Sequence, residues 1–184
     1  MRHRFATMVD IPLLLPTINE AYRGQGGWTA EGHLVSGPRI DLEDLTHLIL
    51  DKPNECKVLV FFEDEGRSEG SEALLGCIKL EKMGEDVFLG LFCVSVAKQG
   101  KGVGKKMLEA AEKWASKLWG SRHALMTVFR VRPELVAYYL RRGYEHTGHV
   151  EPFDYELVQS LGKETPLVAD LDLFVLKKIL ANET

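Results

Sequence analysis

Apolar residues from Val103 onward recur every three to four positions, which is the period of an amphipathic helix. The series is Val103, Met107, Ala111, Trp114 and Leu118. Glu109, Glu112 and Lys113 fall on the opposite, polar side of this predicted helix, and Gly120 ends it.

Short apolar runs rich in β-branched and aromatic residues predict extended strands. They lie at Lys57–Phe62, Ala73–Leu80, Val87–Val96, Ala124–Phe129, Tyr144–Val150 and Leu167–Leu176. Gly90 lies inside one of these runs and predicts a bulge or a kink there. Met83 and Gly84 predict a turn between the second and third runs. The acidic stretch Glu63–Glu72 contains two glycines, so we expect an exposed hairpin loop.

Three further helices are predicted from their start and stop signals. They cover Leu13–Tyr22, Asp41–Leu50 and Pro133–Arg141. Asp10 is the expected N-cap of the first, with Pro12 in its first turn, and Pro16 is expected to kink it or delay its start. The glycine-rich stretch Gly24–Gly37 still carries Trp28, which predicts a loop pinned to the fold.

The order of these elements predicts an α+β or α/β fold. A strand and two helices precede three meandering strands, and then a helix, a strand, a helix and further strands follow. This order favours a mixed sheet with helices on both faces. No stretch resembles a linker, so we expect residues 1–184 to form a single domain.

Composition narrows the classes of function. The chain has 184 residues, of which 45% are hydrophobic, and a formal net charge of −4, which argues against a general nucleic-acid binder. Cys56, Cys77 and Cys93 form no CxxC pair, so we expect reduced thiols in a cytoplasmic protein. The basic N-terminus is not followed by a long apolar stretch, and no apolar run is long enough to span a bilayer, so we expect neither a signal peptide nor a membrane partner.

The segment Val94–Lys106 carries the clearest chemistry. A strand ends, a glycine-rich turn follows, and a helix begins at once, so free N–H groups and the helix dipole form an anion site. We expect a phosphate there, screened by Lys101, Lys105 or Lys106; a solvated turn is the commoner use of such a loop. A Walker loop is excluded because Gln99 replaces its first glycine and no Ser or Thr follows Lys105. A Rossmann fingerprint fails at its third glycine.

Two motifs resemble those of the GNAT superfamily of acyl-CoA N-acetyltransferases. Gln99-x-x-Gly102-x-Gly104 is similar to its pyrophosphate loop, and Tyr139-x-x-x-Gly143-Tyr144 is similar to its tyrosine segment. The order of elements is also that of the family. The chain departs from the family in two places. Val96 replaces the usual proline, and Arg130–Pro133 lacks the usual asparagine, so that Arg130 or Arg132 either contacts a CoA phosphate instead or is solvated.

The resemblance implies a mostly antiparallel GNAT-like sheet, acetyl-CoA as co-substrate and no metal. The implied cofactor-binding residues are Phe92, Cys93, Val94, Gln99, Gly100, Lys101, Gly102, Val103, Gly104 and Lys105. The end of the Phe92–Val94 strand would splay from its neighbour and bind the pantetheine arm. The N–H of Val94 would stabilise the tetrahedral oxyanion, and Tyr139 would protonate the leaving thiolate.

Other roles stay open. Candidates for the general base are Glu20, Glu81, Glu151 and Asp154, or a water chain. Cys93 reads as a buried hydrophobe rather than a nucleophile, and Tyr138 as a packing residue. His146 and His149 fall on opposite faces of a strand, so we expect no metal site between them.

The acceptor is sought in Asn19–Arg39 and Glu151–Ala169, which carry aromatic and acidic residues. The residues are Tyr22, Trp28, Phe153 and Tyr155, and Glu20, Glu31, Glu151 and Asp154. They either form a pocket for a cationic amine or anchor loops. A small-molecule amine is favoured, while a peptide N-terminus, a protein lysine, a non-catalytic CoA-binding module and an adapter remain alternatives. A homodimer formed through the sheet edge is plausible.

Overall fold

The computed structural model describes residues 1–64 and 73–181. The hairpin loop expected at Glu63–Glu72 lies, from residue 65 onward, outside the described residues. Within the described part, no helix is both long enough and apolar enough to cross a membrane.

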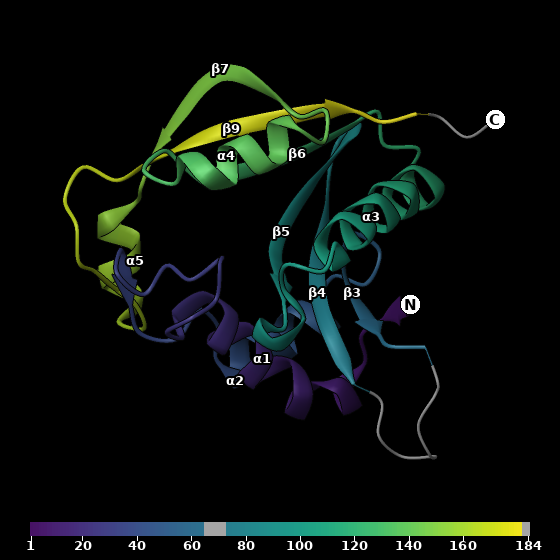
Figure 1. The fold of residues 1–184 in the computed structure, drawn as a ribbon, viewed down its shortest axis with the longest axis horizontal. Helices are drawn as coiled ribbons and strands as arrows, with labels where there is room; N and C mark the ends of the chain where they lie inside the picture. The colour runs from purple at the N-terminus through teal and green to yellow at the C-terminus, as the bar shows by residue number, and fades with distance from the viewer. Residues whose placement is uncertain (65–72, 182–184) are drawn as a thin grey trace.

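A seven-stranded sheet forms the centre of the protein (Figure 1). Its order is β1 (Arg2–Phe5), β3 (Cys56–Phe62), β4 (Leu74–Met83), β5 (Asp86–Val94), β6 (His123–Phe129), β9 (Asp172–Ile179) and β7 (Glu145–Pro152). All neighbours pair antiparallel except β5 and β6, which are parallel. A separate ribbon pairs β2 (Val35–Ser36) with β8 (Thr165–Pro166).

Successive side chains of a strand point to opposite faces of the sheet, and here both faces carry apolar side chains. Helices therefore cover both faces. The elements are η1 (Met8–Asp10), α1 (Ile11–Arg23), α2 (Leu42–Leu50), η2 (Val96–Lys98), α3 (Val103–Trp119), α4 (Pro133–Leu140) and α5 (Tyr155–Leu161). In β3, Val58 and Val60 pack with residues of α1 and α2, whereas Leu59 and Phe61 pack with residues of α3 and α4.

The parallel pair β5–β6 opens after three residues. Their register runs only from Asp86↔His123 to Phe88↔Leu125, and beyond it the two strands diverge (Figure 1). The register of β4 against β5 shifts by one residue in the same region, which places a bulge around Leu91. Leu91 has a φ of +47°, a left-handed conformation that a branched residue adopts only under constraint. The bulge predicted from Gly90 is therefore present and accompanies the divergence.

Most predicted elements are confirmed, with shifted ends. The strand expected at Val87–Val96 stops at Val94, and the one expected at Leu167–Leu176 starts only at Asp172. The strands β2 and β8 and the helix α5 were not predicted, because they are too short to establish a hydrophobic period.

Asp10 is the N-cap residue of α1, as expected, but its side chain makes no capping hydrogen bond to that helix. Its carboxylate instead completes the capping box of η1 by accepting a hydrogen bond from Thr7 N (2.8 Å), and it pairs with Arg4 (2.7 and 2.8 Å). Pro16 does not delay α1, which begins at Ile11 and continues through it.

The helical pattern also predicts a wrong position for Glu112. We expected it on the polar side of the helix, but its side chain is buried and the residue is only 8% exposed. Its carboxylate accepts hydrogen bonds from Tyr144 Oη (2.9 Å) and Lys178 Nζ (2.7 Å). These partners come from distant segments of the chain, which periodicity within one helix does not reveal. Because both hydrogen bonds satisfy the carboxylate, it can be buried.

We expect Glu112→Ala to lower the free energy of unfolding by about 1–3 kcal/mol, because Tyr144 Oη and Lys178 Nζ lose their partner in a buried place. Urea denaturation measures this effect. Glu109→Ala is the matched control on the exposed side of α3 and should change stability by about 0.5 kcal/mol or less. Equal effects of the two substitutions would contradict this account of Glu112.

Candidate active site

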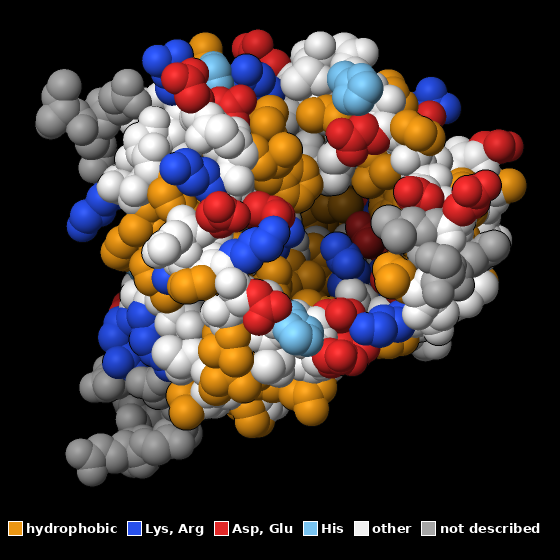
Figure 2. All heavy atoms as spheres, turned by 180° about the vertical axis from the view of Figure 1, so that it is seen from behind, with side chains coloured by type: hydrophobic (Ala, Val, Ile, Leu, Met, Phe, Trp, Pro, Cys, Tyr) orange, Lys and Arg blue, Asp and Glu red, His pale blue; other side chains and the backbone are white. Residues whose placement is uncertain are grey.

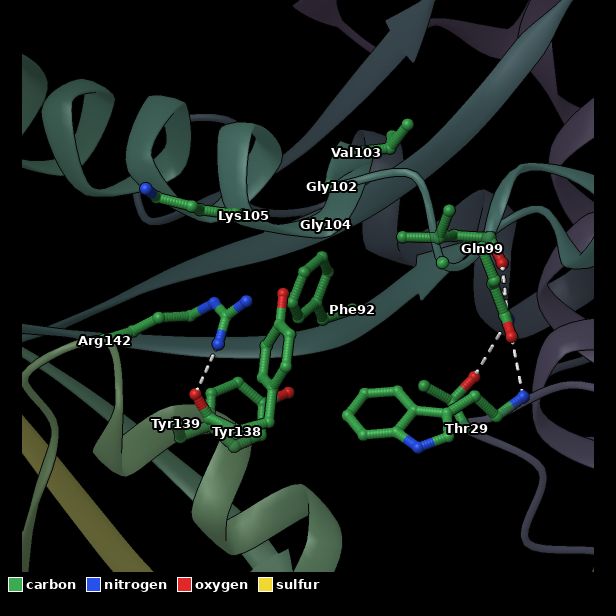
Figure 3. A pocket seen from close by; sticks show the side chains of 13 residues that line it. Thr29, Phe92, Gln99, Gly102, Val103, Gly104, Lys105, Tyr138, Tyr139 and Arg142 are labelled. Carbon is green, nitrogen blue, oxygen red and sulfur yellow. Dashed lines mark hydrogen bonds between the residues drawn. The ribbon is translucent and has the colours of Figure 1, made fainter.

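Two cavities meet where β5 leaves β6. The first, the loop cavity, has a volume of about 430 Å³ and lies between the glycine loop before α3, the end of β5 and helix α4 (Figure 3). The second, the charged cavity, has a volume of about 220 Å³ and lies between the diverging strands and α1. Thr29, Phe92 and Tyr139 line both cavities, so they stand at the junction.

The backbone at the end of β5 faces this junction. Ser95 N donates to Leu75 O (2.8 Å), which makes Val94 and Gly76 a non-hydrogen-bonded pair of the antiparallel ladder. The N–H of Val94 therefore points away from β4, toward the side where β6 no longer pairs. By the same alternation Phe92 faces the junction, and its carbonyl accepts a hydrogen bond from Tyr22 Oη (3.2 Å).

Cys93 is oriented the other way. Its backbone pairs with Cys77 of β4, its buried Sγ lies 3.6 Å from Cys77 Sγ, and it lines neither cavity. The side chain of Cys93 is thus the buried hydrophobe expected from sequence, and its backbone faces β4 rather than the junction because strand residues alternate.

The glycine loop has the geometry of an anion cradle. Gly100 and Gly102 both have φ of +75°, which residues with a Cβ rarely adopt. Lys106 N is the first amide of α3 to bond back, to Gly102 O, so the preceding amides of the helix have no helical partner. The loop cavity is lined by Gly100, Gly102, Val103, Gly104 and Lys105. Lys101 is exposed and outside this lining.

Gln99 lines the cavity, but its amide is bound to the protein. Its Oε1 accepts a hydrogen bond from Trp28 N (2.6 Å), and its Nε2 donates to Val94 O (3.0 Å) (Figure 3). Gln99 thus ties the loop before α3 to the end of β5 and to the segment after α1, and it positions these parts.

Tyr138 of α4 and Arg142, which follows the end of that helix, close the loop cavity. Tyr138 packs, as expected, against the rings of Trp28 and Tyr139, whose centres lie 5.1 and 5.2 Å away. It also lines the loop cavity, where its ring stands beside the Phe92 ring with its hydroxyl toward Gly104 (Figure 3). The guanidinium of Arg142 lies 3.2 Å from the centre of the Tyr138 ring and donates to Tyr138 O (2.6 Å). Its Nε is buried and has no hydrogen-bond partner among the described residues, which leaves a positively charged donor beside the cradle.

Tyr139 is a half-buried phenol at the junction. Burial raises the pKa of its hydroxyl far above the ordinary value, and Tyr138 and Glu31 act in the same direction. No hydrogen bond of this hydroxyl is found within the described part of the chain. Tyr139 is therefore protonated at neutral pH and free to donate.

The charged cavity brings together Arg23, Glu31, Arg39 and Glu164. Arg23 Nη1 lies 3.6 Å from Glu31 Oε2, and its other amino group donates to Glu164. Burial raises the pKa of Glu31 even though Arg39, Arg23 and Arg132 all lower it. Seen from behind, the molecule has a hollow in which acidic and basic side chains stand among apolar ones (Figure 2).

Other candidates lie elsewhere. Glu20, Glu81, Glu151 and Asp154 line neither cavity. Arg132 is buried and donates to Trp28 O and Ala30 O (both 2.8 Å), so it holds the segment that carries Glu31. Arg130 pairs with Asp172 (2.9 Å) outside both cavities.

The described residues contain no group of three or more His, Cys, Asp or Glu able to hold a metal. Of the acceptor residues expected from sequence, Tyr22, Glu31 and Phe153 line the charged cavity and Trp28 lines the loop cavity, while Tyr155 binds the backbone of Val168 and Leu171.

Sequence reasoning missed Arg39 and Arg142, and it did not separate Glu31 from the other carboxylates. The position of Arg142, four residues after Tyr138 at the end of a helix, was a usable signal for their contact. Nothing local distinguishes Arg39.

A Cβ added to Gly104 would lie 2.9 Å from Tyr138 Oη, so we expect a measurable coupling between these positions. Gly104→Ala should be less favourable with Tyr138 present than in a Tyr138→Phe background, by about 0.5–3 kcal/mol. A double-mutant cycle by urea unfolding measures this difference. Alanine also has a higher helix propensity than glycine, but this gain is the same in both backgrounds and cancels in the cycle. Additive effects would show that Tyr138 Oη does not lie against α3.

Comparisons with known proteins agree with this fold. A crystal structure of ribosomal-protein-alanine N-acetyltransferase from Brucella melitensis superimposes with a TM-score of 0.69 at 20% identity, over 98% of this chain and 100% of that one. Spermidine N-acetyltransferase from Vibrio cholerae in complex with CoA and spermine gives 0.69 at 16% identity, over 97% and 95%. Nourseothricin acetyltransferase gives 0.61 at 16% identity, over 98% of both chains.

None of the curated proteins compared with the chain matches it. The structural similarities are below 25% identity and establish the fold. The model of the acetyltransferase (GNAT) family matches residues 27–144, which include the glycine loop, the end of β5 and the tyrosine segment. Because this match spans more than half of the chain, the protein belongs to the GNAT family of acetyltransferases.

Proposed function

We propose that the protein is an acetyl-CoA-dependent N-acetyltransferase of a small-molecule amine. The observation that carries the proposal is the junction of the two cavities, where the unpaired N–H of Val94 and the hydroxyl of Tyr139 lie between an anion cradle and a charged cavity.

The loop cavity fits CoA by its own chemistry. The free amides at the start of α3 suit a pyrophosphate, and Lys105 and the Nε of Arg142, which has no partner in the described part of the chain, add positive charge. The unpaired edge of β5 at Phe92 and Val94 suits the amide-bearing arm, which would add hydrogen bonds like those of a further strand. Bound acetyl-CoA supplies the acetyl group as an activated thioester.

Val94 and Tyr139 have complementary tasks at the junction. The Val94 N–H stabilises the negative charge that develops on the carbonyl oxygen when the amine attacks; such a donor contributes about 3–4 kcal/mol in other acyl-transfer sites. Tyr139 donates its proton to the departing thiolate and is reprotonated by the proton that the acylated nitrogen releases. Its hydroxyl is protonated at working pH, as that of an unperturbed tyrosine also is.

Glu31 is the proposed general base. It lines the charged cavity, and burial raises its pKa toward the working pH, which favours proton abstraction from an incoming ammonium directly or through water. The groups that face it are Arg23, Arg39 and Arg132, together with Tyr22 and Tyr139.

The small volume of the charged cavity, about 220 Å³, favours a free small molecule over a protein tail. The ribbon β2–β8 joins the segment after α1 to the segment after α5. Arg23 pairs with Glu164, and Lys163 pairs with Asp41 (2.7 Å) and Asp44 (2.9 Å). The similar structures are named for acetylation of a ribosomal protein, spermidine and nourseothricin. Their names therefore do not decide between a protein and a small-molecule acceptor.

We expect Tyr139→Phe to lower kcat by about 10²–10⁴-fold, with the Kd for acetyl-CoA almost unchanged, because only the proton donor is lost. Amine-dependent release of CoA thiol measures kcat, and calorimetry measures Kd. Tyr138→Phe is the contrast: it lies against the cradle and should act on Kd more than on kcat. An unchanged kcat in Tyr139→Phe would remove Tyr139 from the mechanism, and acetyl-CoA binding without thiol release for any amine would favour a non-catalytic CoA-binding module.

The pH profile tests Glu31. A base works only when deprotonated, and the pKa of Glu31 is raised, so kcat/KM should fall with decreasing pH at a value above the ordinary range of glutamate. Glu31→Gln should abolish this acidic limb and lower the plateau by about 10²–10⁴-fold. Persistence of the limb in the variant would assign it to another group.

A further inference from the structure

One arginine in the charged cavity forms no ion pair with any described residue. Arg23 is occupied by Glu31, Glu164 and the carbonyl of Gly37 (3.1 Å). Arg39 lines the same cavity, half-buried, and among residues 1–64 and 73–181 its guanidinium makes neither a hydrogen bond nor an ion pair. It lies over the ring of Tyr22, 5.2 Å from the ring centre.

The backbone that carries Arg39 is fixed. Asn19 Oδ1 accepts hydrogen bonds from Arg39 N (2.7 Å) and Ile40 N (3.3 Å), while Asn19 Nδ2 donates to Ile40 O (2.9 Å). The stacking on Tyr22 further restricts the side chain, and Tyr22 itself is bonded to Phe92 O. Arg39 is therefore a positioned cation beside the reaction centre.

Arg39 and Glu31 act on each other across the cavity without closing an ion pair. Arg39 is the charge that most strongly favours the ionised form of Glu31, yet their charged groups are more than 4 Å apart. A ligand with an ammonium and a carboxylate would give each residue a partner: the ammonium would lie at Glu31 and the carboxylate at Arg39. A guanidinium binds a carboxylate through two parallel hydrogen bonds.

We propose that the acceptor carries a carboxylate besides its amine, and that Arg39 binds this carboxylate while the amine lies at Glu31. The inference rests on the proposed N-acetyltransferase function and names its substrate class: a small amino acid, in which the spacing of the two groups is left to experiment. A cavity of about 220 Å³ accommodates a molecule of this size. A polyamine would place a second cation near Arg39, where like charges repel.

Matched sets of acceptors test the inference. Each set contains an amino acid, its amide and its decarboxylated amine, such as leucine, leucinamide and isoamylamine; γ-aminobutyrate against butylamine adds a longer spacing. We measure kcat/KM for each acceptor from the release of CoA thiol. In at least one set, the member with a carboxylate should have a kcat/KM about tenfold or more above that of the members without one. Arg39→Gln should reduce this advantage to about threefold or less, mainly through KM, and Arg39→Lys should be intermediate because it keeps charge but loses the paired donors.

Arg122→Gln, an exposed arginine outside both cavities that pairs with Glu85, is the control and should keep the full preference. Thermal shift by acetyl-CoA verifies that each Arg39 variant is folded, and the shift caused by the best amino acid in the presence of CoA gives a readout independent of turnover.

Equal kcat/KM values for the members that lack a carboxylate, or an undiminished preference in Arg39→Gln, would overturn the inference. Acetylation of polyamines or peptides alone would overturn it and leave the proposed function standing, whereas no acetylation of any amine would overturn both.

Discussion

The site depends on a break in hydrogen bonding between two parallel strands. Three residue pairs hold β5 to β6, and then the strands diverge at the bulge of Leu91. An unpaired strand edge buried in a protein is unfavourable unless something satisfies its polar groups. Here the edge at Phe92 and Val94 opens onto cavities instead of packed core, so the fold keeps backbone donors available for a ligand.

The rest of the site is organised around this opening. Gln99 ties the carbonyl of Val94 to the segment after α1, and Arg132 fastens the same segment from α4. Through these contacts the cradle, the strand edge and the charged cavity keep a fixed relation. Such preorganisation is what electrostatic stabilisation of a transition state requires, because the dipoles need not reorient during the reaction.

The sequence predicted those features that depend on interactions between neighbouring residues. The period after Gly104, the glycine loop and the tyrosine segment depend on neighbouring residues, and the elements appear where expected. Glu112, by contrast, is buried because Tyr144 and Lys178 reach it from segments 32 and 66 residues away. The same holds for Arg39 and Glu31, whose environment arises only when the ribbon β2–β8 and the diverging strands enclose them. No period or spacing in one sequence encodes such encounters.

Amide hydrogen exchange at the end of β5 tests the central claim most directly. In the free protein the Val94 N–H should exchange rapidly while the Cys93 N–H, paired with β4, is protected, and acetyl-CoA should protect Val94 selectively. Protection of Val94 in the free protein, or exchange that acetyl-CoA leaves unchanged, would contradict the account.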